Sequence, residues 1–513
     1  MPKTVMIVAF HNQQALGARY LANAAEGAGY YPLIVYFKEF NSISPTPASE
    51  IELGLLRSLV DEYKPVCVGF SVMSSMYLDT VRAAHGALAG MGVPLVWGGA
   101  FPSLMPERAM DYCDYVVRGE GEGAFAELLK ILEESDGMFP DESKPSLKNL
   151  VWRDGDGSIV VNDLRPLTQE IDTLGYPKLT RDNVRFIHHD RMTDGAFQFK
   201  ALTYDLTASR GCPFACSYCS SINLRRLYSG ERYVRFRSVD SVMEELRDAK
   251  SKIKNLSLVH FWDEIFSDEE GWVADFTSRY KKEIGLPFTI WGHPLMSDPA
   301  ILRLLVGAGL DQAVIGIQSG SPRIRREVFN RTESQEQILE AGRNFVSSGI
   351  PNLVYDFLLG HPFESIDDLR ESFGLLMELE EGFSLQVHGL HFLPATDIVQ
   401  KAIDAGIITP EEMESILWSP MSEQYGTWFV ASGGSQIKAV WLDLIFLTQF
   451  PRLKPRLSAL AKKLDACGED DGALPPELAR SVSKLKLEPE RKLARAQKVR
   501  KGMLAVKGIL KRK

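Results

Sequence analysis

The sequence predicts an α/β protein made of two large domains and a helical C-terminal region. Apolar, strand-like runs alternate with amphipathic helices from residue 5 to about 135, and again from about 201 to 400. A loop with three cysteines opens the second of these regions. We therefore expect a first domain at 1–135, a linker with a β-hairpin at 136–200, a second domain at 201–400 and a helical region at 401–513.

Composition narrows the class of protein. The chain has 513 residues, of which 45% are hydrophobic and 24% charged, and its net charge is -9. These values are typical of a globular protein and argue against a nucleic-acid partner. Six cysteines are too few for a disulfide framework. The N-terminus lacks the layout of a signal peptide, and no apolar run reaches the roughly 18 residues of a membrane span. We expect a cytoplasmic protein.

The first domain is expected to be a doubly wound parallel sheet of the Rossmann or flavodoxin type. Strands are predicted at 5–10, 33–37, 66–71, 94–97 and 115–117, and helices at 17–29, 51–63 and 78–90. Such a sheet binds its ligand at the carboxyl ends of its strands. In the following linker, the Asp154–Gly157 turn predicts a hairpin over 150–161, and His188 and His189 are expected in a polar loop.

The central motif is the loop that carries Cys212, Cys216 and Cys219. It follows a predicted strand at 201–207 and the turn Ser209–Gly211. Clustered thiolates select zinc or an iron–sulfur cluster, and structural zinc needs four ligands where this loop offers three. The spacing C-x-x-x-C-x-aromatic-C resembles the signature of the radical SAM superfamily. The resemblance implies a 4Fe-4S cluster with one iron left open to S-adenosyl-L-methionine (SAM).

The same resemblance implies a partial (β/α)6 barrel for residues 201–400, where six strand–helix units are predicted. Chemistry in such a barrel lies at the carboxyl ends of the strands. Asp263 and Glu264 follow the second strand, where the family binds the amino group of SAM. Gln318 and Ser319 follow a later strand, where relatives use Glu-Ser to contact the ribose.

Three further residues receive roles from the family pattern. Arg331 is expected to pair with the SAM carboxylate through a two-pronged contact, with Arg323, Arg325 and Arg326 as nearby competitors that otherwise lie on an exposed helix face. Gly360 begins Gly-His-Pro-Phe-Glu, which stands where the family has a Gly-x-Pro-Gly-Glu-Thr stretch near the adenine. Tyr218 is expected over the cluster or the adenine, with plain packing as the alternative. The four histidines in or near the barrel strands are candidate acids or bases, with a core or rim position as the alternative: 293, 361, 388 and 391.

Several loops of the first domain resemble the cobalamin-binding domain attached to many radical SAM enzymes. The resemblance rests on GFSVMSS at 69–75, WGGAFPSLMPE at 97–107 and VVRGEGEGAF at 116–125. Glycines at strand ends let a flat macrocycle approach the backbone, and serines can bind the cofactor's tail. The alternative is a flavodoxin-like domain with another ligand. The candidate residues in these loops are Ser71, Ser74, Ser75, Gly98, Gly99, Gly119 and Glu120.

The first strand–helix loop departs from one cobalamin pattern. Domains that ligate cobalt through histidine carry D-x-H-x-x-G there, whereas this chain has Asn12, Gln14 and Gly17 at those positions. An amide is a poor cobalt ligand. We therefore expect cobalamin without a histidine lower ligand, and we expect His11 to be a polar loop residue.

The resemblance implies a cobalamin-dependent radical SAM enzyme that cleaves SAM to a 5′-deoxyadenosyl radical. Methyl transfer from methylcobalamin to an unactivated carbon is the leading expectation. The class B methyltransferases and the anaerobic Mg-protoporphyrin ester cyclases share this domain order, so an oxidative cyclase is the alternative. A non-catalytic corrinoid or SAM sensor is the alternative from another class. Partners are a small-molecule substrate and a flavodoxin- or ferredoxin-type electron donor.

The C-terminal region is expected to be helical at 401–405, 410–417 and 437–450, followed by an acidic linker at 465–476. Ten Lys or Arg residues lie between Arg491 and Lys513, with an apolar stripe at helical spacing. Such a helix either packs on its own protein or lies on an anionic membrane surface. Peripheral membrane contact therefore stays an open alternative.

Overall fold

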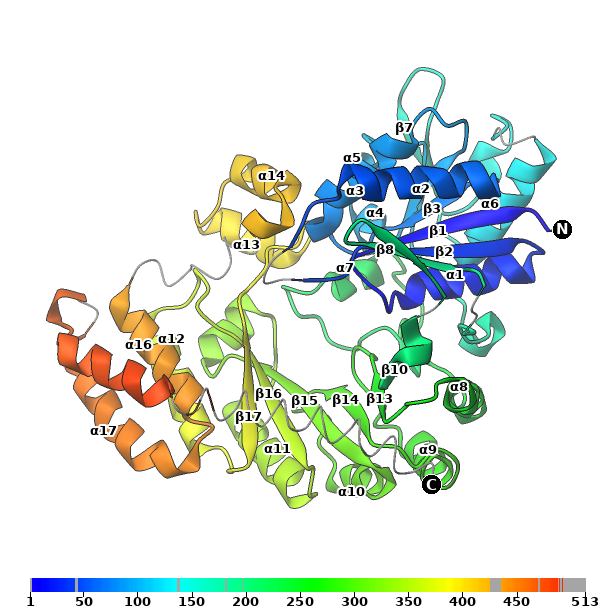
Figure 1. Ribbon diagram of the computed structural model, residues 1–513. Coiled ribbons are helices and arrows are strands. Elements are labelled where there is room, and N and C mark those ends of the chain that lie inside the picture. The colour runs from blue at the N-terminus through cyan, green and yellow to red at the C-terminus, as the bar shows by residue number, and fades with distance from the viewer. Residues whose placement is uncertain are drawn as a thin grey trace. The chain divides into compact units, whose positions relative to one another are not determined.

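The computed structural model describes residues 2–41, 45–135, 139–179, 182–195, 197–424, 435–468, 471–487, 489 and 491. The chain divides into two compact units. The first comprises Met1–Phe199, Cys219–Arg237 and Phe392–Tyr425, and the second comprises Lys200–Tyr218, Ser238–His391 and Gly426–Lys513. Each unit contains one large β-sheet, and the α/β fold class predicted from the sequence is confirmed (Figure 1).

The first unit is built on a nine-stranded sheet with the order β7-β6-β5-β4-β3-β1-β2-β8-β9. The five central strands, β5 to β2 in this order, and β8 run parallel, whereas β6, β7 and β9 are antiparallel additions at the two edges. The strands are β1 (Thr4–Phe10), β2 (Tyr31–Phe37), β3 (Val68–Ser71), β4 (Leu95–Gly98), β5 (Tyr115–Val117), β6 (Leu150–Arg153), β7 (Ile159–Val161), β8 (Val184–His188) and β9 (Arg191–Asp194).

Both faces of this sheet are covered, as the continuous apolar strands require. Met6, Val8 and Phe10 of β1 join one buried cluster, and Val5 and Ile7 join the other. Helices α2 and α3 cover the first face, and α1 and α6 the second; Figure 1 shows α1 and α2 on opposite sides of the strands. Their bounds are α1 (Leu16–Gly27), α2 (Glu50–Tyr63), α3 (Leu78–Leu88) and α6 (Glu122–Glu134), and two short helices, α4 (Ala100–Leu104) and α5 (Pro106–Ala109), lie between β4 and β5.

The segment 136–200 differs from its expected role as a linker. Its hairpin, β6–β7, forms as predicted, but it pairs with β5 and extends the sheet. A second hairpin, β8–β9, pairs with β2 at the other edge. His188 is therefore a strand residue rather than part of a polar loop, and His189 occupies the left-handed turn with φ 51°. Pairing with existing strand edges explains why a polar stretch becomes sheet.

The second unit is built on a six-stranded sheet with the order β10-β13-β14-β15-β16-β17, in which every neighbouring pair is parallel. This is the six-unit arrangement predicted from the sequence. Helices α8 to α11 lie along one face of the sheet in Figure 1. The bounds are β10 (Thr203–Leu206), α8 (Val239–Lys252), β13 (Leu258–Phe261), α9 (Glu270–Glu283), β14 (Phe288–Gly292), α10 (Pro299–Ala308), β15 (Leu310–Gln318), α11 (Gln335–Ser347), β16 (Asn352–Leu358), α12 (Ile366–Glu378) and β17 (Phe383–His388).

Shorter elements flank the cysteine loop. A two-residue strand, β11 (Ser209–Arg210), precedes the loop, and α7 (Ser220–Arg226) and β12 (Arg235–Phe236) follow it.

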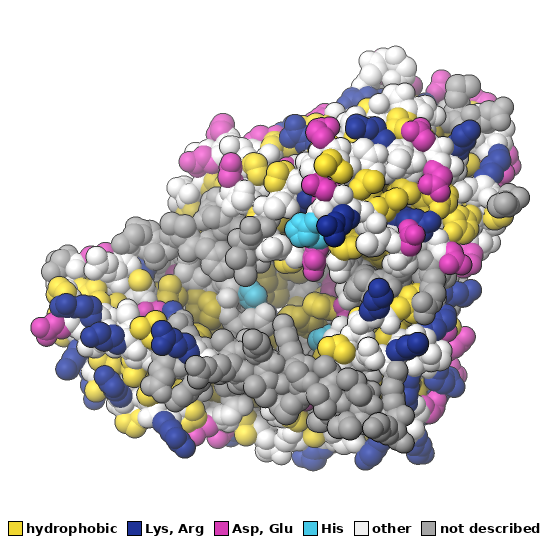
Figure 2. All heavy atoms as spheres, viewed as in Figure 1, with side chains coloured by type: hydrophobic (Ala, Val, Ile, Leu, Met, Phe, Trp, Pro, Cys, Tyr) yellow, Lys and Arg dark blue, Asp and Glu magenta, His cyan; other side chains and the backbone are white. Residues whose placement is uncertain are grey.

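The C-terminal region is helical. Helices α13 (Asp397–Asp404) and α14 (Pro410–Trp418) belong to the first unit, and α16 (Gln436–Leu447) and α17 (Lys454–Asp465) to the second. Helix α17 buries Leu457, Leu460 and Leu464, whereas Arg456, Lys462 and Lys463 are exposed. Figure 2 shows Lys and Arg side chains on the surface where α16 and α17 lie in Figure 1. Among the described helices, none combines the length and apolar character needed to cross a membrane. The basic tail, on which the membrane alternative depends, lies outside the described residues apart from Arg491.

Candidate functional site

The cysteine loop leaves the carboxyl end of the first barrel strand, β10, as the sequence predicted. Cys212, Cys216 and Cys219 are all partly exposed, and none forms a disulfide bond. The loop ends at Cys219, which is the N-cap of α7 and whose sulfur accepts a hydrogen bond from the Ser221 backbone N–H at 3.5 Å. Three reduced thiols on one short loop are therefore available to a shared inorganic group.

Asp263 fixes the beginning of this loop. Its carboxylate accepts hydrogen bonds from the Ala208 N–H at 3.0 and 3.1 Å and from the Ser209 hydroxyl. Burial raises the pKa of Asp263 to about 6, although these hydrogen bonds favour the charged form. Both oxygens are thus engaged by the loop, and the neighbouring Glu264 is the exposed carboxylate after β13.

A segment after β15 holds the back of the loop. Ser217 is fully buried, and its backbone N–H donates to the Phe329 carbonyl at 3.0 Å. The Ser217 hydroxyl donates to the Val328 carbonyl at 2.5 Å, and the Asn330 side chain donates to the Ala215 carbonyl at 2.7 Å. Phe329 also packs edge-on against Tyr218, with ring centroids 4.9 Å apart. The loop conformation is therefore set by protein contacts.

Arg331 lies in the same segment and is 5% exposed. Its Nη1 lies 3.7 Å from Cys216 Sγ and 3.2 Å from the Tyr218 hydroxyl, and its Nη2 donates to the Gly316 carbonyl at 2.6 Å. Its Nε donates to Glu333 at 2.6 Å. The sequence predicted Arg331 as a partner of the SAM carboxylate, whereas its guanidinium here contacts the cysteine loop itself. The partner Glu333 was not identified from the sequence.

Gln318 ends β15 in a strained conformation, with φ 71°. The register between β15 and β16 shifts between Gly316 and Gln318, so the Gln318 side chain lies over Gly316. Its amide donates to Asp356 at 3.2 Å, and its Oε1 is buried without a hydrogen-bond partner. Asp356 in turn lies 3.1 Å from His388 Nε2, and hydrogen bonding to Asp356 raises the pKa of His388. Strained residues of this kind cluster at functional sites.

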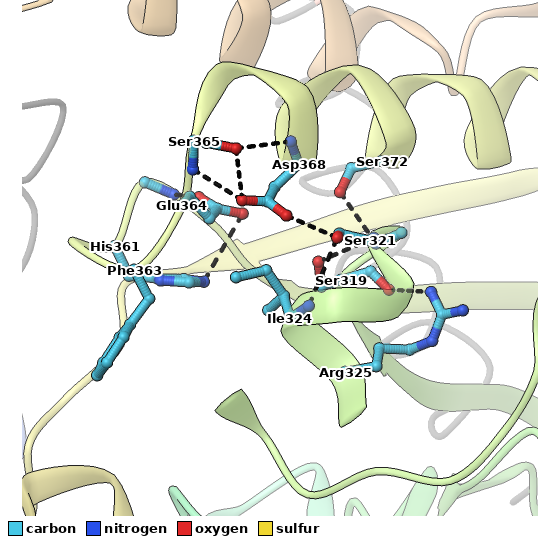
Figure 3. Close-up of polar contacts among 12 residues, drawn as sticks. Ser319, Ser321, Ile324, Arg325, His361, Phe363, Glu364, Ser365, Asp368 and Ser372 are labelled. Carbon is cyan, nitrogen blue, oxygen red and sulfur yellow. Dashed lines mark hydrogen bonds and ion pairs between the residues drawn. The ribbon is translucent and has the colours of Figure 1, made fainter. Parts of the chain in front are cut away.

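Ser319 takes part in a polar network that joins the loop after β15 to α12 (Figure 3), and Gly360 lies in the loop between β16 and α12. The Ser319 carbonyl accepts from Arg325 at 2.8 Å, and its hydroxyl accepts from the Ser321 N–H at 3.2 Å. Asp368 accepts from the Ser321 hydroxyl at 2.7 Å. The Gly360 N–H donates to Glu364 at 2.6 Å. The polar groups of Ser319 are thus satisfied within the protein.

The first-domain candidates gather at the carboxyl edge of the nine-stranded sheet. In the loop after β1, Asn12 Oδ1 accepts from the backbone N–H groups of Gln14 and Ala15, both at 2.9 Å, and Gln14 Oε1 is buried without a partner. A Cβ on Gly17 would meet nothing within 4 Å. His11 is buried, with Nε2 3.0 Å from Thr80 and Nδ1 3.3 Å from the Glu39 carbonyl. Its ring nitrogens are therefore used by the protein, as expected of a loop residue.

Ser71 and Gly98 stand side by side where β3 and β4 end. Ser74 caps a short turn by accepting from the Met76 N–H at 3.3 Å, and Ser75 is buried. Gly99 has φ 109°, and a Cβ there would lie 2.7 Å from the Val72 carbonyl, so only glycine fits. Together with Asn12 and Gln14, these residues form one edge of the sheet. Gly99 exposes its backbone, Ser71 and Gly98 have small side chains or none, and Gln14 Oε1 is buried without a hydrogen-bond partner. Such an edge fits a large planar cofactor.

Gly119 and Glu120 are engaged elsewhere in the unit. A Cβ on Gly119 would lie 2.0 Å from the Tyr228 hydroxyl, so the glycine makes room for that tyrosine. Glu120 forms a two-pronged ion pair with the buried Arg235, at 2.7 and 3.0 Å. Both residues were predicted to bind the cofactor, and in the structure both have contacts that anchor the segment 219–237.

The three cysteines of the loop also indicate which kind of inorganic group could bind there. Across the described ranges, no three His, Cys, Asp or Glu side chains converge on a point that could hold a single metal ion. A cluster bridged by its own sulfides does not require convergence on one point, and its ligands are thiolates. The three free cysteines therefore fit an iron–sulfur cluster better than zinc.

Family comparisons agree with this geometry. The Radical SAM superfamily model matches residues 206–376, and the B12 binding domain model matches residues 2–129. The chain is a radical SAM protein with a B12 binding domain. These two families account for the cofactors expected from the sequence, a 4Fe-4S cluster with SAM in the second domain and cobalamin in the first.

Two curated relatives of this radical SAM protein indicate the range of activities in the family. It is 24% identical over 339 residues to an uncharacterized methyltransferase of Pyrococcus horikoshii, covering 65% of this chain and 68% of the relative. It is 26% identical over 291 residues to the anaerobic magnesium-protoporphyrin IX monomethyl ester cyclase of Cereibacter sphaeroides. That match covers 54% of this chain and 43% of the cyclase, so it spans less than half of the cyclase.

Two solved structures share the fold. The radical SAM methyltransferase TsrM from Kitasatospora setae, with tryptophan substrate and a SAM analog bound, superposes with a TM-score of 0.61 at 16% identity, covering 78% of this chain and 76% of TsrM. The cobalamin-dependent enzyme OxsB, with aqua-cobalamin bound, superposes with a TM-score of 0.62 at 14% identity, covering 98% of this chain and 81% of OxsB. At these identities the likeness concerns the fold.

Proposed function

We propose that this radical SAM protein is a cobalamin-dependent methyltransferase that methylates a carbon of a small molecule. The observation that carries the proposal is the presence, in one chain, of a B12 binding domain and a cysteine loop at the carboxyl end of the first barrel strand. The relative with the longer coverage is named a methyltransferase. For methylation of an unactivated carbon, a cobalt-bound methyl group would supply the methyl donor and a SAM-cleaving cluster would supply the radical that activates the carbon.

On the cysteine loop, Cys212, Cys216 and Cys219 would hold three irons of the cluster. When bound, the cluster supplies an electron to SAM, and the bound cobalamin supplies a methyl group. The exposed Glu264 is suited to the SAM amino group, and Gln318 Oε1 can accept a hydrogen bond from a hydroxyl or amine at the carboxyl ends of the strands. An external donor of the flavodoxin or ferredoxin type would reduce the cluster.

In the first unit, the cobalamin edge would consist of Asn12, Gln14, Gly17, Ser71, Ser74, Ser75, Gly98 and Gly99. No histidine would ligate the cobalt from below, because Gln14 occupies the position that histidine holds in the other pattern and His11 is bound to Thr80 and Glu39. An open lower face suits a cobalt centre that gives up and regains a methyl group.

The test is anaerobic reconstitution with iron, sulfide and hydroxocobalamin, followed by metal analysis and turnover with SAM that carries a deuterated methyl group. We expect about four irons and one cobalt per chain, and transfer of the label to a molecule in a small-molecule extract. Tryptophan and a magnesium porphyrin are the first defined substrates to try, because related proteins act on them. Iron without cobalt would contradict methyl transfer, and no iron would contradict the whole proposal.

An oxidative cyclase remains the second candidate, because one relative is named a cyclase. It would consume SAM to 5′-deoxyadenosine without forming S-adenosylhomocysteine or a labelled product. A sensor would form neither nucleoside. Measuring both products in the same reaction therefore separates the three activities.

A further inference from the structure

The buried guanidinium of Arg331 lies next to a sulfur that the proposed function assigns to the cluster. Four of its contacts are to protein groups: Cys216 Sγ at 3.7 Å, the Tyr218 hydroxyl at 3.2 Å, the Gly316 carbonyl at 2.6 Å and Glu333 at 2.6 Å. Arg331 is 5% exposed and Glu333 is 1% exposed. Water therefore screens neither charge effectively.

A second layer holds this ion pair in place. His293 is 3% exposed, and its Nδ1 accepts a hydrogen bond from the Leu295 N–H at 3.1 Å, which leaves the proton on Nε2. Nε2 points toward Glu333, 3.7 Å from Oε2. His293 also contacts the cysteine loop directly, because its ring stacks on Phe214 with centroids 3.7 Å apart and an interplanar angle of 18°. Phe214 lies between Cys212 and Cys216 in the sequence.

A buried ion pair needs a reason, since a buried pair often adds little to stability compared with apolar packing. Here Arg331 donates a hydrogen bond toward Cys216 Sγ, and Glu333 offsets the positive charge of Arg331. Hydrogen bonds and net charge near the sulfurs set the reduction potential of an iron–sulfur cluster. A positive group beside a ligand sulfur favours the form of the cluster with one more electron, and a carboxylate behind it weakens that effect.

We propose that Arg331 and Glu333 act as positioning residues that set the reduction potential of the cluster bound by Cys216, with Arg331 raising the potential and Glu333 lowering it. The inference rests on the proposed function, because it requires that Cys216 ligate the cluster. It gives Arg331 a role distinct from binding the SAM carboxylate. It also explains why the guanidinium points to the cysteine loop and to the Gly316 carbonyl.

The experiment is a redox titration of the full-length, reconstituted protein without SAM, with dithionite and mediators, followed by electron paramagnetic resonance of the reduced cluster. In Arg331→Met, the ratio of reduced to oxidised cluster at the wild-type midpoint should fall about tenfold, which is about 59 mV toward negative potential for one electron. In Glu333→Gln the ratio should rise. Arg331→Lys keeps the charge and should fall between the wild type and Arg331→Met.

Lys38→Met is the matched control, because Lys38 also forms a buried ion pair, with Glu52 at 2.7 Å, but lies in the first unit. The cluster potential of this variant should match that of the wild type. The proposal is overturned if Arg331→Met and Glu333→Gln leave the potential unchanged, if they shift it in the same direction, or if Arg331→Met, Arg331→Lys and Glu333→Gln all lose iron that Lys38→Met keeps. If the potentials are unchanged and SAM binds more weakly to the Arg331 variants, the role of Arg331 is to bind the SAM carboxylate, as the sequence predicted. Absence of iron from the wild type would instead refute the proposed function.

Discussion

The six cysteines divide into three that share a loop and three that do not. Burial raises the thiol pKa of Cys67 and Cys113, which opposes formation of the thiolate that binds iron. Alanine in place of Cys212, Cys216 or Cys219 should remove most of the bound iron, because a cluster with two protein thiolates is poorly held. Iron per chain after anaerobic reconstitution measures this. Cys467→Ala, at a partly exposed thiol in the turn after α17, should keep its iron, and equal losses would refute the assignment.

We predict that the buried carboxyl group of Glu364 makes the free energy of unfolding depend on pH. It is 3% exposed, and burial raises its pKa to about 8. Because the folded protein holds this proton more tightly than the unfolded chain does, the stabilisation is complete below pH 4.5 and is lost as pH rises through 8. Its neighbours do not titrate in that range, since burial lowers the pKa of His361 to about 3 and hydrogen bonding outweighs burial to bring that of Asp368 to about 2.

Glu364→Gln keeps an acceptor for the Gly360 N–H and removes the titration. The free energy of unfolding of the wild type relative to this variant should therefore fall by on the order of 3 kcal/mol between pH 5 and pH 8. Urea unfolding at several pH values measures it. Asp367→Asn, at an exposed carboxylate paired with Arg370, is the control variant, because it keeps the buried carboxyl group of Glu364. A flat difference for Glu364→Gln would contradict the prediction.

The site residues show where reasoning from sequence stops. The cysteine spacing is local, so the loop and its position after β10 could be predicted. The contacts of the other site residues could not be predicted, because the residues in contact are far apart in the sequence. Arg331 contacts Cys216 across 115 positions, and Glu120 binds Arg235 across the same separation. Gln318 was identified, but its strained backbone follows from a register shift that no sequence pattern reveals. Asp356 and His388 meet only when β16 and β17 pair.

At the level of secondary-structure elements, the loop after β15 packs closely against helix α12 at Gly320. A Cβ there would lie 2.2 Å from the Ser372 Cα, so Gly320→Ala must push the strand end away from the helix. We expect a loss of about 2 kcal/mol or more in the free energy of unfolding, as for overpacked cores. Gly374→Ala in the same helix meets nothing within 4 Å and should stabilise by about 0.5–1 kcal/mol. Thermal or urea unfolding of the two variants measures both changes in the free energy of unfolding. Equal changes in Gly320→Ala and Gly374→Ala would contradict the packing argument.

The predicted elements agree with the structure where apolar periodicity is strong. Strand β1 and helix α2 were placed within one residue of their bounds, because one is a continuous apolar run and the other lies between the capping residue Ser49 and Pro65. Helix α6 was missed because its start lies in a glycine-rich stretch, and β8 and β9 because their sequence is polar. These elements form by packing on or pairing with a sheet that already exists, which local sequence does not encode.

For the whole molecule, the division into two units predicts that the two cofactors load separately. The first unit has its own buried clusters on both faces of its sheet, and the proposed cobalamin edge lies within it. Cys212 and Cys216, with Arg331 and Glu333, lie in the second unit, and Cys219 begins the segment 219–237 of the first unit. The contacts that hold the cysteine loop through Ser217, Asp263 and Arg331 involve none of the residues of the proposed cobalamin edge. Loss of iron should therefore leave cobalt binding intact, and the reverse should also hold.

Two variants test this independence. Gly98→Val places a side chain at the edge where β3 and β4 end, and its Cβ would meet only the Val117 carbonyl at 3.4 Å, so the sheet should still form. We expect it to lose cobalt and keep about four irons, whereas Cys216→Ala should lose iron and keep its cobalt. The cobalt spectrum should be the same in His11→Gln as in the wild type, because that imidazole is not a ligand. Neither cofactor-deficient variant should methylate a carbon, since the proposed reaction uses both a methyl group from cobalamin and an electron from the cluster. Loss of both metals from either variant would show that the units depend on each other for cofactor binding.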